Sequence, residues 1–83
     1  MVSIKMKQKK TLTTDLKKIF QKELNVSVKE NGKIYDSIQW DSLGNFRIIL
    51  ACEKKFGIKF ASEEYTTVQS FKGLIKAITK KLK

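Results

Sequence analysis

Apolar residues recur at helical spacing in three parts of the chain. From Leu12 onward they lie three or four positions apart, and lysines occupy the positions between them. The same spacing returns over residues 42–56 and again after Thr67. The pattern predicts three amphipathic helices. Their expected inward residues are Leu12, Leu16, Ile19, Phe20 and Leu24 in the first helix, Leu43, Phe46, Ile49, Leu50 and Phe56, broadened by Ile48, Ala51 and Cys52, in the second, and Val68, Phe71, Leu74, Ile75, Ile78 and Leu82 in the last.

Residues with helix-starting and helix-ending chemistry lie between these runs. Asn25 stands near the expected end of the first helix, and Gly57 provides a stop for the second. Ser62 precedes two acidic residues, which predicts a cap and the first turn of a brief third helix. Thr67 is the expected cap of the last helix.

A long connection separates the first two helices. It runs from about residue 25 to Asp41 and contains Asn31-Gly32, a pair typical of turns. Its apolar residues suggest a loop held against a core, and loops of this length in small domains commonly carry function. Residues 1–10 form a basic lead, either frayed or continuous with the first helix, and we expect it to be partly mobile.

Three main helices, one short helix and a long first loop predict an all-α four-helix bundle. The 83 residues, of which 41% are hydrophobic, suffice for one small core, and we take 11–83 as the domain. An α+β alternative remains open, in which the short segments 26–28 and 58–60 pair as strands.

Composition limits the chemistry that the chain can perform. It has no histidine, and Cys52 is its single cysteine, so neither an internal disulfide nor a cysteine–histidine metal cluster is available. Cys52 falls within an apolar helical run, where we expect a buried and inert thiol. These features predict a protein without catalytic residues or a bound metal.

The charge is strongly positive. The chain has 18 basic and 8 acidic residues and a formal net charge of +10. This charge favours nucleic acid, anionic lipid or acidic proteins as partners. No apolar stretch approaches the roughly 20 residues that span a bilayer, and no secretory signal is visible. We therefore expect a cytoplasmic protein without a membrane span.

The tripeptide Asp41-Ser42-Leu43 lies where the polar loop meets the second helix. A serine at this place is ordinarily a cap, because its oxygen accepts a hydrogen bond from a first-turn amide. The same amides and the positive end of the helix dipole would also favour a phosphate esterified to Ser42. The residues alone leave both interpretations open.

Three segments in order carry a resemblance to a known family: Asp41-Ser42-Leu43, Glu53-Lys54-Lys55-Phe56-Gly57-Ile58 and Thr66-Thr67-Val68-Gln69-Ser70. With the helix pattern around them, the chain from about Leu12 to Leu82 resembles the acyl carrier protein family. The resemblance implies that Ser42 bears a 4'-phosphopantetheine, transferred from coenzyme A by a phosphopantetheinyl transferase that uses a divalent metal. The arm's thiol would then carry acyl groups as thioesters, as in fatty acid biosynthesis and related lipid metabolism.

The resemblance also assigns supporting roles. Asp41 would position the helix start or the transferase's metal, and Leu43 would pack or contact partners. A second pair, Asp36-Ser37, lies in the loop five residues upstream. We expect an ordinary turn role for Ser37.

The chain departs from the family pattern in its charge. Gly44, Arg47, Lys54 and Lys55 occupy positions where the family often has acids, leaving Glu53 as the one acid of this helix. The departure predicts a carrier in a specialised pathway, whose acyl-loading and acyl-transfer enzymes have neutral or acidic docking surfaces. We also expect the protein to be a monomer. Trp40 also departs from the pattern. It either covers the base of the loop, flanks the pantetheine arm, or joins the docking surface with the three basic residues.

Two other functions remain open. One is an interaction module that has the carrier fold but is never modified, with Ser42 as a cap. The other is a basic nucleic-acid-binding protein, although its phenylalanines fall at core positions and no recognition motif for a specific nucleic acid is visible. The identity of the cargo is also open.

Overall fold

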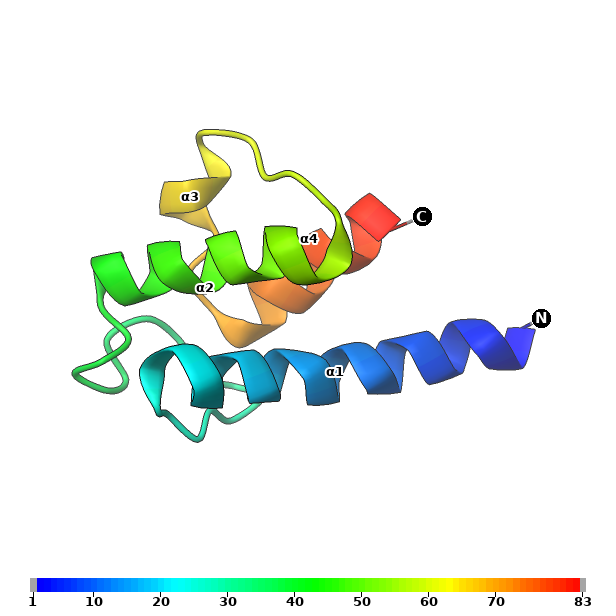
Figure 1. Ribbon diagram of the computed structural model, residues 1–83, viewed down its shortest axis with the longest axis horizontal. Helices are drawn as coiled ribbons and strands as arrows, with labels where there is room; N and C mark the ends of the chain where they lie inside the picture. The colour runs from blue at the N-terminus through cyan, green and yellow to red at the C-terminus, as the bar shows by residue number, and fades with distance from the viewer. Residues whose placement is uncertain (1, 83) are drawn as a thin grey trace.

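Four helices and their connections make up the part of the chain that the structure describes (Figure 1). The structure is a computed structural model that describes the backbone of residues 2–82 and the side chains of residues 11–82. The helices are α1 (Val2–Leu24), α2 (Ser42–Phe56), α3 (Glu64–Thr67) and α4 (Phe71–Leu82). The all-α prediction is confirmed. The alternative with paired strands is wrong, because segments 26–28 and 58–60 form no strand and the one bridge among the described residues joins Lys33 to Ser70.

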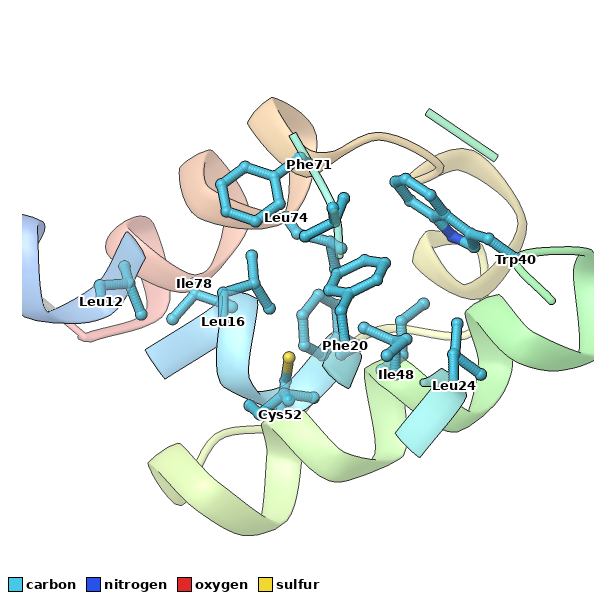
Figure 2. Close-up of a cluster of buried hydrophobic side chains, with 14 of the residues drawn as sticks. Leu12, Leu16, Phe20, Leu24, Trp40, Ile48, Cys52, Phe71, Leu74 and Ile78 are labelled. Carbon is cyan, nitrogen blue, oxygen red and sulfur yellow. The ribbon is translucent and has the colours of Figure 1, made fainter. Parts of the chain in front are cut away.

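The hydrophobic core lies where α1, α2 and α4 meet (Figure 2). Side chains from all three helices are fully buried there, and each such aliphatic or aromatic group contributes about 1.5–3 kcal/mol. The core residues with at most 1% exposure are Leu16, Phe20, Trp40, Ile48, Ile49, Cys52, Phe71, Leu74 and Ile78. In α4, Ile78 is the last fully buried residue, and Leu82, one turn further on, is half exposed, contrary to its predicted inward position.

The buried face of α2 is only part of the wide apolar face that was predicted. The helix turns Asn45, Ile48, Ile49 and Cys52 toward the core, whereas Leu43, Phe46 and Leu50 are exposed. The prediction placed the strongest apolar residues inside. The structure instead buries a side that includes a polar residue, which is possible because Asn45 finds hydrogen-bond partners there.

The helix ends confirm some predicted signals and correct others. Gly57 adopts a left-handed conformation (φ 65°) and its N–H donates to the carbonyl of Glu53, so it ends α2 as predicted. Ser62 does not cap α3, which is preceded by Glu63 without a side-chain capping bond. Thr67 is the last residue of α3, and the cap of α4 is Ser70, whose Oγ accepts from the Gly73 N–H (3.0 Å).

Helix α1 begins at Val2, so the basic lead is continuous with the first predicted helix. The predicted mobility of residues 1–10 stays a prediction. Met1 and the side chains of residues 2–10 lie outside the described part. Within residues 2–82, no helix combines the length and the apolar character that crossing a bilayer requires.

The long loop between α1 and α2 is held in place from both sides. Two backbone hydrogen bonds join it to the connection before α4 and to the start of α4: Ile34 N–H donates to the carbonyl of Gln69 (2.8 Å), and Phe71 N–H donates to the carbonyl of Gly32 (2.9 Å). At its end, the Trp40 ring meets Phe20 edge-on with ring centres 4.6 Å apart. The loop therefore ends at a fixed point, immediately before α2.

Candidate functional site

The first turn of α2 is capped by Asp41. Its Oδ1 accepts a hydrogen bond from the Gly44 N–H (2.8 Å), and its backbone carbonyl accepts from the Asn45 N–H (2.8 Å). Its extended backbone (φ −101°, ψ −167°) is typical of a residue that precedes a helix. The prediction that Asp41 positions the helix start is confirmed, and the interpretation of Ser42 as the cap is wrong.

Ser42 is the first helical residue, and its side chain is exposed. Its Oγ lies 2.7 Å from the Tyr35 hydroxyl, close enough for a hydrogen bond in which either group can donate. In the described structure, the amides of Ser42 and Leu43 have no acceptor. The hydroxyl is thus accessible at the positive end of a 15-residue helix.

Tyr35 is a site residue that the sequence did not reveal. Its side chain is 66% exposed, and its backbone has a positive φ of 74°, which is uncommon for a residue other than glycine. A tight loop imposes this conformation, since Tyr35 N–H donates to the Trp40 carbonyl (2.6 Å) and the preceding turn is closed by Lys33 N–H to Asp36 Oδ2 (2.9 Å). No sequence signal predicts a left-handed tyrosine, so only the folded loop shows it beside Ser42.

Ser37 has the turn role that was expected. Its carbonyl accepts from the Trp40 N–H (3.1 Å), and its Oγ is buried without a hydrogen-bond partner among the described residues. The two candidate serines therefore differ in access, with an exposed hydroxyl at Ser42 and a covered one at Ser37.

Asn45 joins three segments behind the site. Its Oδ1 accepts from Trp40 Nε1 (2.9 Å), and its Nδ2 donates to the Val68 carbonyl (2.9 Å) in the α3–α4 connection. Asn45 is 1% exposed, and its bond with Trp40 is buried, whereas the bond to Val68 is partly buried. They fix the position of α2's first turn relative to the loop and to α4.

Gly44 owes its identity to this packing. A Cβ atom at this position would collide with the carbonyl oxygen of Gln39. This packing also explains why position 44 lacks an acid, because no acidic side chain fits there. Trp40 needs correction as a docking residue: it is 1% exposed and so covers the base of the loop, the first of its predicted roles.

An exposed apolar stripe lies next to Ser42 along α2. Leu43 is 67% exposed, Phe46 43% and Leu50 42%, and they follow one another at spacings of three and four residues. The Phe46 ring also contacts Tyr65 of α3, with ring centres 5.2 Å apart. Leu43 thus meets solvent rather than packing inside.

The three predicted basic docking residues do not form one cluster with Ser42. Arg47 lies 3.9 Å from Glu23 of α1, a partly solvated pair. Lys54 and Lys55 are exposed in the last turn of α2, and at 1.5 Å per residue Lys54 lies about 18 Å along the helix from Ser42.

Glu53, the one acid of α2, supports the loop that follows the helix. Its Oε2 accepts from the Phe60 N–H (2.8 Å) and from the Tyr65 hydroxyl (2.9 Å). The hydrogen bond from the Phe60 amide is the main cause that lowers the pKa of this carboxyl below its usual 4.5. Its partners give Glu53 a structural role.

Cys52 is buried, as predicted, and burial raises the pKa of its thiol to about 12. A thiol of this kind stays protonated at neutral pH and does not act as a nucleophile. Within the described side chains, no three residues of the types His, Cys, Asp and Glu gather as metal ligands. The accessible hydroxyls at the start of α2 are those of Ser42 and Tyr35.

The sequence matches no protein-family model.

Proposed function

We propose that this protein is an acyl carrier whose phosphopantetheine arm is attached to Ser42. The observation that carries the proposal is that Asp41, and not Ser42, caps α2. Asp41 accepts the capping hydrogen bond, and Ser42 keeps an exposed hydroxyl on the first residue of α2. A serine required as the cap would have its oxygen engaged by an amide, and modification would disturb the helix.

The surroundings of Ser42 suit the proposed phosphodiester. Its negative charge would lie at the helix N-terminus, where the dipole and the amides of Ser42 and Leu43 favour an anion. Esterification replaces the proton of the Ser42 hydroxyl by the phosphorus of the pantetheine phosphate and releases the nucleotide part of coenzyme A. The carrier supplies the acceptor oxygen, and the transferase supplies the metal and the catalytic groups.

A carrier also needs a rigid base for a flexible arm. Asn45 joins α2 to the loop and to the α3–α4 connection, and Gly44 permits the close approach of the loop backbone. The supporting contacts restrict the arm's attachment point, so that motion is confined to the cofactor itself.

The exposed residues Leu43, Phe46 and Leu50 provide an apolar surface beside the arm. Partner enzymes with an apolar patch next to neutral or acidic groups would fit this surface and Arg47. Replacing Arg47, Lys54 and Lys55 by glutamate would slow acyl transfer by the chain's own partner enzymes; unchanged or faster transfer would contradict their docking role.

The proposal is tested by incubating the purified protein with coenzyme A, Mg²⁺ and a broad-specificity phosphopantetheinyl transferase, followed by intact-mass measurement. The account predicts a gain of one phosphopantetheine unit, which is lost in Ser42→Ala and retained in Ser37→Ala. Circular dichroism establishes that both variants are folded. No gain, or a gain that survives Ser42→Ala, would overturn the assignment.

A further inference from the structure

The positive charge is unevenly distributed along the chain. Residues 25–70, which contain α2 and α3, have six basic and six acidic residues and carry no net charge. Residues 1–24 and 71–83 have twelve basic and two acidic residues, and so they hold the entire net charge of +10. The charge therefore belongs to α1, α4 and the residues that flank them.

The charged helices have a distinct place in the fold. Figure 1 shows the first turns of α1 and the last turns of α4 at one end of the molecule, whereas α2 begins at the other end. The molecule measures 40 Å along its longest axis. A partner attracted to the basic end is thus separated from Ser42.

A groove of about 620 Å³ lies between α1 and α4. Ile75 of α4 provides an apolar wall beside the buried Phe71, and Thr13 of α1 lines the other side. Lys72, Lys76 and Lys80 border the groove. The groove therefore combines an apolar interior with a basic edge.

The basic edge is available for a partner. Lys72, Lys76 and Lys80 are exposed and spaced four residues apart, which places them on one side of α4 about 6 Å apart along its axis. They form no ion pair among the described side chains. The acid that lines the groove, Glu30, is paired with Lys17 at 3.3 Å, which offsets its charge.

We propose that the α1–α4 groove binds an acidic amphipathic helix of a partner protein. Such a helix has an apolar stripe that would enter the groove and contact Ile75, and carboxylates at spacings of four residues that would meet the three lysines of α4. A flat bilayer surface would leave the concave interior unfilled. Nucleic acid would bring phosphates to the three lysines but has no aliphatic stripe to fill the apolar interior.

This docking surface does not depend on modification of Ser42. None of the described residues that line the groove belongs to α2, so the first turn of α2 lies outside this docking surface. A partner helix joined to an acyl-transfer enzyme would therefore raise the effective concentration of the carrier near that enzyme, a consequence that rests on the proposed function.

The test uses the unmodified protein and two fluorescent helical peptides of equal length. Both carry the same stripe of leucines, flanked in one by glutamates and in the other by lysines. Fluorescence anisotropy should show binding of the acidic peptide, weakened by salt, and at least about tenfold weaker binding of the basic one. Equal binding of the two peptides would overturn the proposal.

Matched variants locate the site. Lys72→Glu/Lys76→Glu should weaken binding of the acidic peptide by about tenfold or more, whereas Lys54→Glu/Lys55→Glu, which changes the net charge equally, should leave it within about twofold. Circular dichroism controls for folding. If both double variants lost the same affinity for the acidic peptide, the attraction would depend on net charge alone, and the groove would not be the binding site.

Two further experiments test the competing partners, anionic lipid and nucleic acid. Vesicles with and without anionic phosphatidylglycerol, and a mixed-sequence single-stranded oligonucleotide, are titrated at physiological ionic strength. If either binds more tightly than the acidic peptide and depends on Lys72 and Lys76, the assignment to an acidic helix is wrong. Weaker binding of both, insensitive to these substitutions, supports it.

Discussion

The hydrogen bond between Trp40 and Asn45 makes a quantitative prediction about the base of the proposed site. Trp40 Nε1 donates to Asn45 Oδ1, and Asn45 Nδ2 donates to the Val68 carbonyl, both at 2.9 Å. Asn45→Ala removes both partners at once. The buried Trp40 N–H left unpaired costs about 1–3 kcal/mol, and the partly buried Val68 carbonyl adds to this, so the variant should lose at least about 1–3 kcal/mol. At about 0.05–0.15 kcal/mol per residue the whole domain has only about 4–12 kcal/mol of stability.

A double-mutant cycle separates this hydrogen bond from the other contacts of the two side chains. Trp40→Phe, Asn45→Ala and the double variant are unfolded in urea. Unfolding is followed by circular dichroism, because replacing Trp40, the only tryptophan, removes the tryptophan fluorescence signal. The double variant should be more stable than the sum of the single effects predicts, with a coupling energy of about 1–2 kcal/mol. Effects that add to within about 0.5 kcal/mol would refute the role of Asn45 as the link between loop and helix.

Three further predictions concern other residues near α2. Gly44→Ala should lower the free energy of unfolding in urea by about 1–3 kcal/mol, because its Cβ meets the Gln39 carbonyl. Gly73→Ala is the control and should lose less, because its Cβ meets a serine side-chain oxygen that can move. Equal losses would contradict this reasoning. Because hydrogen bonds lower the pKa of Glu53 in the folded state below its usual 4.5, its contribution is present above that pH and is lost as the pH falls through the folded pKa. The urea midpoints of wild type and Glu53→Gln should therefore converge on acidification, and a constant difference would refute the role of this carboxylate. Cys52, whose pKa is raised to about 12, should react with a disulfide reagent at mildly alkaline pH only after unfolding in urea, and rapid reaction of the native protein would contradict its burial.

The bounds of α2 could be predicted from sequence because local chemistry determines both ends. Asp41 caps the first turn and Gly57 takes the left-handed conformation after the last. The border between α3 and α4 was predicted wrongly, since Thr67 and Ser70 are both plausible caps and only the bonds of the connection decide between them.

Features that depend on contacts between distant segments could not be predicted. Tyr35 reaches Ser42 through a left-handed backbone that the closed loop imposes. The inward turn of Asn45 depends on donors and acceptors supplied by Trp40 and Val68. The pattern of apolar residues indicates that a helix has a buried side, but the packing of α1 and α4 decides which side that is.

The central claim is that the Ser42 hydroxyl carries a covalent arm in the living cell. The most direct measurement is the intact mass of the protein purified from its native cells, followed by fragmentation that assigns any added mass to a residue. We predict a phosphopantetheine unit on Ser42, with or without an acyl group on its thiol. A chain with unmodified Ser42 throughout, or with the added mass on another residue, would contradict the account.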